Sequence, residues 1–286
     1  MLTKEIEEKI IDFIKEEPKS IYEIARLIGK SWRTTDKYVN YLTEKYEEIK
    51  IKVFRKGSRG ALKVVFWKSI LPFSSEIKEW LYRKIENGRE KVDFSPFEIF
   101  QFANTNKKIA FIHKGKFIMG RETPKSFKRV ISLLDKAENE VLSFSGNFSW
   151  INLSYKNLSL YEKVKELVER GVKIFAIGRI DVDGRKNIEK LLNINFETKT
   201  NLIKVKHIYQ PLRGFIIDNK VARFREIKDP KKYMKDELKQ KILIFYEIYD
   251  KEWIDFLRKT FWRLFRVGVD ARKRIEEIEK MKIVKE

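Results

Sequence analysis

The chain has 286 residues, of which 43% are hydrophobic and 37% charged, and its formal net charge at pH 7 is +21. It has no cysteine and only two histidines, His113 and His207, which excludes disulfides and thiolate metal sites, so we expect no metal or other cofactor. Its apolar runs are too short to span a bilayer and its N-terminus is not that of a signal peptide, so we expect a cytoplasmic protein without membrane contact.

Two domains are the expectation for a chain of this length. The positive charge attracts polyanions, of which nucleic acid is the commonest inside a cell. A lysine-rich composition of this kind is also typical of proteins from heat-adapted organisms. The local sequence therefore has to decide whether the chain binds nucleic acid.

Residues 1–70 predict a winged helix-turn-helix. A first amphipathic helix ends before "EEPKS", and Ser20 with Glu23 forms a capping box for a second helix that ends at Gly29. Ser31 caps a third helix, and two alternating strands, "IKIKVFRKG" and "ALKVVFWK", follow it. Three helices followed by a basic hairpin are the order of a winged domain that binds double-stranded DNA.

The third helix of such a domain enters the major groove by its N-terminal end. Arginine pairs with guanine edges, and serine or threonine with base edges or phosphates. Residues 51–70 hold six basic side chains and no acidic one. The alternative, a winged helix that contacts only protein, fits this charge poorly. The candidate DNA contacts are Ser31, Trp32, Arg33, Thr34, Thr35 and Lys37 on the helix, and Arg55, Lys56 and Arg59 on the hairpin.

Residues 71–107 are expected to form a helical linker or a dimerisation segment. "SEIKEWLYRKIENG" predicts a helix ended by Gly88, and "SPFEIFQFAN" a shorter one with Pro96 in its first turn. DNA-binding domains of this type generally work in pairs matched to two half-sites, so we expect a homodimer. The aromatic side chains of this segment either pack across such an interface or belong to an ordinary core.

Residues 108–286 predict an α/β sandwich with a mixed sheet. Strands at "EVLSFSG" and "VKIFAIG" alternate with helices, and the run "LIKVKHIY", "RGFIIDN", "KVARFREI" and "KILIFYEIY" follows. One long helix, "KEWIDFLRKTFWRLFRVGVDARKRIEEIEKM", is expected to close the chain.

Residues 125–265 resemble one repeat of the phospholipase D-like fold. The matching elements are the helix at 126–137, the strand at 141–145, "LVERGVKIFAIG", the hairpin "RGFIIDNKVARF" and the closing "FWRLF". With the winged helix in front, the chain resembles TrmB-type archaeal transcription regulators. That resemblance implies a nucleoid-associated protein whose second domain senses an effector or mediates assembly.

Active phospholipase D-type enzymes carry His-x-Lys and, after four intervening residues, Asp, and the histidine attacks phosphorus. Placing Asp218 on the motif's aspartate puts Arg213 at the lysine and Pro211 at the histidine. His207 fits neither the spacing nor the strand direction. We therefore expect no catalytic residue and no enzymatic activity, with Asp218 capping the turn "DNK". A nuclease that uses His113 or another site is the alternative.

In this fold a pocket lies at the strand ends, where Asn147, Arg179, Asp181 and Arg213 are expected to converge. Two arginines and an amide suit a small anionic or sugar-like effector. The alternative is that these are surface residues in ordinary salt bridges. Residues 107–129 add eight basic side chains against one glutamate, which favours binding of many phosphates with little sequence preference.

The main hypothesis is a dimeric DNA-binding transcription regulator with a catalytically degenerate phospholipase D-like domain. The first alternative is an architectural, chromatin-like protein that coats DNA without sequence preference. A phospholipase D-type nuclease is a further alternative, and structured RNA remains open as the partner. The sequence does not predict the DNA sites, the genes or the effector.

Overall fold

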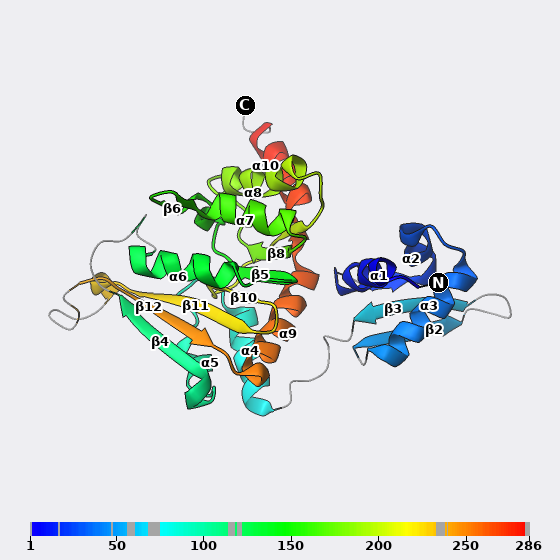
Figure 1. Ribbon diagram of the computed structural model, residues 1–286, viewed down its shortest axis with the longest axis horizontal. Coiled ribbons are helices and arrows are strands. Elements are labelled where there is room, and N and C mark those ends of the chain that lie inside the picture. The colour runs from blue at the N-terminus through cyan, green and yellow to red at the C-terminus, as the bar shows by residue number, and fades with distance from the viewer. Residues whose placement is uncertain are drawn as a thin grey trace. The chain divides into compact units, whose positions relative to one another are not determined.

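The computed structural model describes residues 2–16, 18–46, 48–55, 61–67, 75–113, 118, 122–232, 238 and 240–283. The chain forms two compact units, residues 1–72 and 73–286 (Figure 1). Within the described ranges, no helix combines the length and the apolar character needed to cross a bilayer. The expected wing residues Lys56 and Arg59 lie outside the described residues.

The first unit has the element order predicted from the sequence. Its elements are α1 (Lys4–Glu16), β1 (Lys19–Ser20), α2 (Ile21–Ile28), α3 (Trp32–Lys45), β2 (Ile49–Arg55) and β3 (Ala61–Trp67). The strands form an antiparallel sheet in the order β1-β3-β2. A core of aliphatic side chains joins the helices to this sheet: Ile10, Ile14, Ile21, Ile24, Val39, Leu42, Ile49 and Val65.

Local capping fixes the turn between α2 and α3. The Ser20 hydroxyl accepts from the Glu23 amide at 3.2 Å, and the Glu23 carboxylate accepts from the Ser20 amide at 2.7 Å. Gly29 closes α2 with a φ of 62°, a left-handed conformation that suits glycine. The Ser31 hydroxyl then accepts from the Thr34 amide at 3.2 Å and starts α3. The predicted capping box and helix boundaries are confirmed.

The second unit is built on one mixed sheet of eight strands in the order β13-β9-β8-β5-β10-β11-β12-β4. Strands β5, β8 and β9 pair in parallel and the other neighbours are antiparallel. The strands are β4 (Lys108–His113), β5 (Glu140–Phe144), β8 (Lys173–Gly178), β9 (Ile203–His207), β10 (Gly214–Ile217), β11 (Val221–Lys228), β12 (Ile242–Ile248) and β13 (Val269–Asp270). The predicted α/β class with a mixed sheet is confirmed.

Helices cover both faces of this sheet (Figure 1). One face carries α6 (Pro124–Leu134), α7 (Leu160–Glu169), α8 (Arg185–Glu197) and α10 (Ala271–Ile283), and the other carries α4 (Glu76–Asn87), α5 (Phe97–Phe100) and α9 (Lys251–Val267). The central strand β5 is buried at every position, as expected for a strand enclosed from both sides. Short elements complete the unit: η1 (Thr105–Lys107), η2 (Ser149–Asn152), β6 (Ser154–Tyr155), β7 (Leu158–Ser159) and η3 (Pro230–Lys232).

Helices α4 and α5 are part of the second unit. Leu81, Ile85, Phe94 and Ile99 are buried in the core between the sheet and α9. Over the described residues 75–107, the segment expected to be a linker therefore packs as ordinary core, because its apolar positions meet the apolar side of α9. A role in dimerisation stays a prediction.

The closing segment is two helices and not one. Helix α9 ends at Val267, and β13 pairs antiparallel with β9 at Val269 and His207 before α10 begins. The expectation of one continuous helix is wrong because Gly268 leaves the helical conformation, at a φ of −68° and ψ of 147°, and the chain gains a place at the sheet edge.

Candidate functional site

Helix α3 presents a polar face to solvent. Arg33, Lys37, Asn40 and Tyr41 are exposed, and their spacing of three and four residues places them on one side of the helix. Arg33 and Lys37 are not ion-paired within the described part of the chain. Guanidinium and amide groups make bidentate contacts with guanine and adenine edges. This face has the chemistry of a recognition helix.

Two of the six residues predicted on α3 are held by the first unit itself. Thr35 is fully buried, and its hydroxyl donates to the Ser31 carbonyl at 3.0 Å. Helical spacing puts Thr35 on the side of Val39 and Leu42, which face the core, so the expectation that it contacts DNA is wrong. Trp32 is half-buried against this core, with the Lys63 ammonium 5.4 Å from its ring centroid.

Ser31 and Thr34 lie at the N-terminal end of α3. Their hydroxyl oxygens are 2.9 Å apart, and that of Ser31 caps the helix. The main role of this pair is to begin the helix, since an N-cap hydroxyl stabilises it by about 1 kcal/mol. The positive end of the helix dipole at this point favours a negatively charged partner such as phosphate.

The hairpin is tied to α3 by charge. Lys63 on β3 bridges both carboxylate oxygens of Asp36 on α3 at 2.7 and 2.8 Å. This contact neutralises the acidic residue closest in sequence to Arg33 and Lys37. The backbone of Arg55 is described, as the end of β2, and its side chain lies outside the description together with Lys56 and Arg59. Their DNA contacts stay predictions.

Acidic side chains of the first unit gather at the other end of α3. Glu7 on α1 accepts from the Lys45 ammonium at 2.7 Å and from the Tyr46 hydroxyl. These hydrogen bonds, that of Lys45 first, hold the pKa of Glu7 below its ordinary value. Lys45, the exposed cation at the C-terminal end of the helix, is therefore paired, whereas Arg33 and Lys37 nearer the N-terminal end form no ion pair with the described residues.

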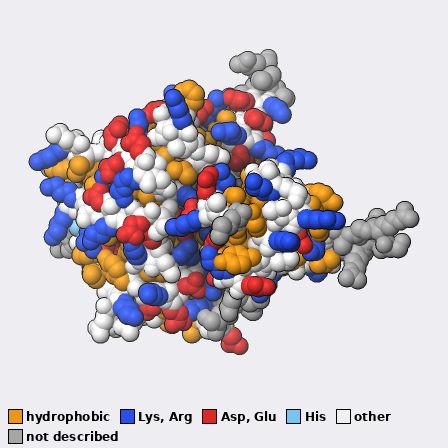
Figure 2. Space-filling view, turned by 45° about the vertical axis from the view of Figure 1, so that its right-hand side comes forward, with side chains coloured by type: hydrophobic (Ala, Val, Ile, Leu, Met, Phe, Trp, Pro, Cys, Tyr) orange, Lys and Arg blue, Asp and Glu red, His pale blue; other side chains and the backbone are white. Residues whose placement is uncertain are grey.

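The surface of the second unit is mixed in sign over the face shown in Figure 2, where blue and red side chains alternate. Surface ion pairs of this unit include Lys163–Asp135 and Lys220–Glu138, both at 2.7 Å. In the basic segment 107–129, Arg129 pairs with Glu247 at 2.7 Å, and Lys108 donates to the carbonyls of Phe100 and Gln101 at 2.9 Å. These two side chains are committed within the unit.

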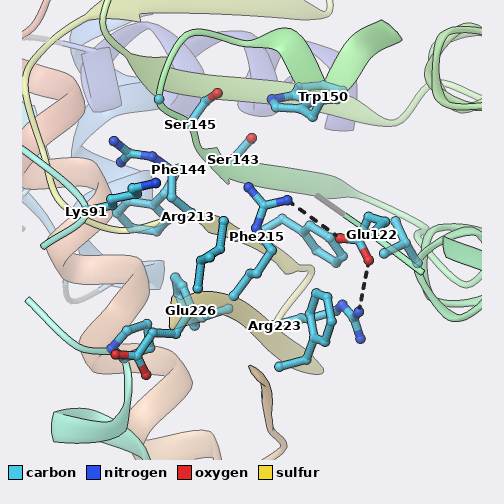
Figure 3. Close-up of a pocket in the computed structure, with 18 of the residues that line it drawn as sticks. Lys91, Glu122, Ser143, Phe144, Ser145, Trp150, Arg213, Phe215, Arg223 and Glu226 are labelled. Carbon is cyan, nitrogen blue, oxygen red and sulfur yellow. Dashed lines mark ion pairs between the residues drawn. The ribbon is translucent and has the colours of Figure 1, made fainter. Parts of the chain in front are cut away.

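A cavity of about 850 Å³ lies in the second unit, lined by strands β5, β10 and β11, by α6 and α7, and by the segment 91–96 (Figure 3). Asn147 and Arg213 line it, as predicted, whereas Arg179 and Asp181 do not. The latter two form an ion pair at 2.7 Å, and Asp181 accepts from the Gly184 amide at 2.7 Å. Asp181 thus helps to shape the turn before α8, and a ligand site shared by all four residues stays a prediction.

Arg213 is positioned by backbone carbonyls. Its Nη1 donates to Gln210 at 2.8 Å and to Leu212 at 2.7 Å. A Cβ on Gly146 would lie 2.9 Å from the Arg213 Nε, so glycine is needed there for the side chain to lie against this loop. These two carbonyls and the close approach of Gly146 therefore hold the guanidinium in place at the cavity wall.

A buried charge cluster, formed by Glu122, Arg129, Arg223, Arg225 and Glu247, adjoins the cavity. Glu247 bonds Arg223 at 2.8 Å and Arg129 at 2.7 Å, and Glu122 lies 3.9 Å from Arg223 and 4.0 Å from Arg225. Burial raises the pKa of Glu122. Burial acts in the same direction on Glu247, but the hydrogen bonds from Arg129 and Tyr249 outweigh it and hold the pKa of that carboxyl below its ordinary value.

Asp218 has a role in folding that differs from the prediction. It is buried, and its carboxylate accepts from the backbone amides of Glu138, Asn139 and Glu140 at 3.1, 2.9 and 3.0 Å. It therefore caps the turn that leads into β5 and not its own turn. A carboxylate suits this position because three inward-pointing amides would otherwise be left without acceptors.

Neither histidine lines the cavity. His207 Nδ1 accepts from the Ile180 amide at 2.9 Å, and His113 Nδ1 lies 3.0 Å from the Thr123 hydroxyl. Burial lowers the pKa of both rings, which favours neutral imidazoles with structural hydrogen bonds. Within the described ranges, no group of three or more His, Cys, Asp and Glu residues is arranged to hold a metal ion.

No protein-family model and no curated protein sequence matches the chain. Several solved structures are similar to the chain in fold, at low sequence identity. The chain is similar to TrmBL2, an archaeal chromatin protein described with a novel mode of DNA binding, at 14% identity and a TM-score of 0.41 over 94% of this chain and 95% of that one.

Two further solved structures cover just over half of this chain. Nuc from Salmonella typhimurium, a phospholipase D family member, has 11% identity and a TM-score of 0.38 over 58% of this chain and 99% of that one. NucT from Helicobacter pylori has 14% identity and a TM-score of 0.39 over 57% of this chain and 98% of that one. At these values none of the likenesses assigns a function to the chain.

Sequence reasoning missed two groups of site residues. Asn40 and Tyr41 continue the exposed face of α3, and their helical spacing from Arg33 and Lys37 was the available signal. Arg223 and Arg225 alternate with buried apolar positions of β11. Two arginines at a spacing of two beside the buried positions 221, 222 and 224 indicate a buried charge cluster, but their partners come from distant segments.

Proposed function

We propose that the protein binds double-stranded DNA through its first unit, with α3 in the major groove. The observation that carries this proposal is the exposed face of Arg33, Lys37 and Asn40 on a helix whose acidic neighbour, Asp36, is neutralised by Lys63. An α-helix fits the major groove of B-form DNA, whereas that of A-form RNA is too deep and narrow for such a helix. DNA is therefore the favoured partner over structured RNA.

The mode of binding follows from the charge. The net charge of +21 and the six basic side chains in residues 51–70 favour many phosphate contacts, which bind with little sequence preference and with a steep dependence on salt. Architectural coating of DNA is the mode that this observation supports. Contacts from Arg33 and Asn40 to base edges would give such a coating protein a preference for certain base pairs.

A second candidate function is transcription regulation by a small-molecule effector. The cavity of about 850 Å³ in the second unit favours it, because an enclosed space of that size is typical of a ligand site. Footprinting of the full chain on long duplex DNA distinguishes the two functions. Continuous protection at rising protein concentration supports coating, and discrete protected sites support regulation.

We propose further that the second unit does not hydrolyse phosphodiesters. Pro211 stands where a phospholipase D-type nucleophile is needed, and both histidines make structural hydrogen bonds away from the cavity. The test is incubation of the full chain with nicked, single-stranded and duplex DNA, with and without divalent metal. Cleavage that co-purifies with the protein and disappears in a His113→Asn or His207→Asn variant would contradict this proposal.

The same preparation tests the main proposal. Fluorescence anisotropy with a duplex DNA and a duplex RNA of equal length and matched sequence should show tighter binding of DNA at every salt concentration. Equal affinity for DNA and RNA would contradict the proposal. So would unchanged DNA binding when Arg33 and Lys37 are both replaced by alanine, because α3 would then not be the helix that contacts DNA.

A further inference from the structure

The cavity of the second unit has an apolar interior. Side chains from α6, α7 and the loop between β5 and α7 form it: Val130, Leu134, Leu153, Leu160, Val164 and Leu167. Each of these retains at most 5% exposure, so this part of the lining is closely packed. A cavity of this size and lining accommodates the hydrocarbon part of a small organic molecule.

Two polar groups of the cavity wall have no hydrogen-bond partner among the described residues. The indole Nε1 of Trp150 is buried without a hydrogen bond, and the hydroxyl of Ser143, a residue with 7% exposure, forms none with the described residues. Figure 3 shows both side chains pointing into the same space. A buried N–H without an acceptor costs free energy, so an acceptor supplied by a ligand would stabilise this wall.

The sheet sets the direction of the charged groups. Ser143, Phe215, Arg223 and Glu247 are successive partners across β5, β10, β11 and β12, so all four side chains lie on the α6 and α7 side of the sheet. Arg225, two residues further along β11, lies on that side as well. The strand register therefore brings guanidinium groups beside the two unpartnered polar groups.

Positive charge exceeds negative charge here. The buried charge cluster holds three guanidinium groups and two carboxylates, and Arg213 adds a fourth cation at the cavity. The full lining holds six basic side chains against five acidic ones: Lys91, Arg213, Arg223, Arg225, Lys228 and Lys241 against Asp93, Glu98, Glu122, Glu226 and Asp229. An anion therefore fits this wall better than a cation does.

We propose that the cavity binds a small amphipathic anion whose carboxylate or phosphate head contacts Arg225, Ser143 and Trp150, and whose hydrocarbon body fills the interior between α6 and α7. A sugar fits less well, because the interior offers few hydrogen-bond partners for several hydroxyl groups. The ligand class is thus narrower than the anionic or sugar-like effector expected from the sequence.

The test uses calorimetric titration of the full chain with decanoate below its critical micelle concentration. We expect saturable binding with one site per chain and a negative heat-capacity change, which reports burial of apolar surface. Decanol, which lacks the charge, and acetate, which lacks the body, should each bind at least tenfold more weakly. Decyl phosphate in place of decanoate shows which of the two head groups the site prefers.

Variants locate the site. Ser143→Ala removes only the hydroxyl oxygen and leaves the ion pairs intact, and it should weaken decanoate binding at least threefold. Val164→Phe fills the interior and should weaken it at least tenfold, as should Arg225→Met. Arg179→Met, an exposed position outside the cavity, should leave affinity within twofold. Thermal melting without ligand checks that each variant is folded.

Two results would overturn the proposal. One is equal affinity for decanoate and decanol, since the charged head would then contribute nothing. The other is unchanged decanoate affinity in both Ser143→Ala and Val164→Phe, since one change is on β5 where the head group is placed and the other is on α7 in the apolar interior. Because none of these measurements includes DNA, they are independent of the function proposed for the first unit.

Discussion

At the scale of single residues, α3 separates side chains that hold the fold from those that are exposed to solvent. Thr35 and Asp36 are satisfied inside the first unit, by the Ser31 carbonyl and by Lys63. Arg33 and Lys37, on the same turn, point to solvent. A base-reading role for Arg33 and a phosphate-binding role for Lys37 predict different consequences of losing each side chain.

Replacing Arg33 by alanine should weaken binding to a preferred DNA sequence by about 1–3 kcal/mol and relax the preference at one base pair. Lys37→Ala should instead weaken binding to all sequences and reduce the slope of log K against log salt by about one. Titrations of labelled duplexes at several salt concentrations measure both. Lys9→Ala on α1, where Lys9 pairs with Glu5, is the control and should change neither.

His207 gives the second unit a dependence on pH. Burial lowers the pKa of its ring below the ordinary value of about 6.5, so the unfolded chain takes up the proton first as the pH falls. Its contribution to stability is therefore present above pH 6.5 and is lost as the pH falls towards the folded-state pKa. His113, whose pKa is also lowered by burial, acts in the same direction.

Urea unfolding at pH 7.5 and 5.5 checks this prediction. Wild type should lose stability over that range, and His207→Asn, which keeps an acceptor for the Ile180 amide but does not titrate, should lose less. A variant with the same loss as wild type would show that the ring does not contribute. The loss of stability at low pH follows from the direction of the pKa shift alone.

At the scale of elements, the parts of the fold that depend on neighbouring residues were predictable. The cap at Ser20 and the end of α2 at Gly29 rest on hydrogen bonds within a few residues. The break between α9 and α10 was not predictable, because β13 forms only where β9 offers an edge to pair with. The helices α4 and α5 were likewise predicted to be a separate segment, because the sequence does not show that α9 provides the surface that buries them.

The same distinction applies to the candidate sites. The exposed face of α3 could be predicted because caps, helical spacing and charge lie in one stretch of sequence, and its contact with DNA stays a prediction. Two residues of the cavity, Asn147 and Arg213, were predicted, but its charged wall could not be, because that wall joins Glu122, Arg223 and Glu247 from three distant segments. Asp218 was recognised as a structural residue, but its partners at 138–140 lie about 80 positions away.

Asp218 provides the prediction at this scale. Asp218→Asn keeps the size of the side chain and tolerates its left-handed backbone, at a φ of 49°, but removes the charge that three amides share. We expect a loss of about 2–3 kcal/mol in the free energy of unfolding, the range for hydrogen bonds to a charged group. Chemical denaturation measures it, and Asn219→Ala, on the exposed next residue, should change stability by less than about 0.5 kcal/mol. An equal effect of both changes would contradict the capping role.

At the scale of the whole molecule, two separate hydrophobic cores predict two unfolding transitions. Leu42 is buried in the first unit and Leu257 in the second. Leu42→Ala should cost about 2–5 kcal/mol and lower the midpoint of one transition by at least about 8 °C in a unit of this size. Leu257→Ala should lower the midpoint of the other.

Differential scanning calorimetry of the full chain distinguishes the transitions. Duplex DNA should raise only the midpoint that Leu42→Ala lowers, because a ligand stabilises the unit that binds it. A shift of both midpoints by either substitution would show one cooperative unit, and a DNA-induced shift of the Leu257 transition alone would place the DNA site on the second unit.

Strand β4, at one end of the eight-stranded sheet, has a practical consequence for anyone preparing the protein. Among the described strands it pairs only with β12, and Ile109 and Ile112 are 44% and 62% exposed. An exposed edge strand with apolar side chains of this kind favours aggregation between molecules in concentrated solution. The substitution Ile112→Lys places a charge on this strand and should reduce aggregation. It is the first change to make if the protein precipitates on storage.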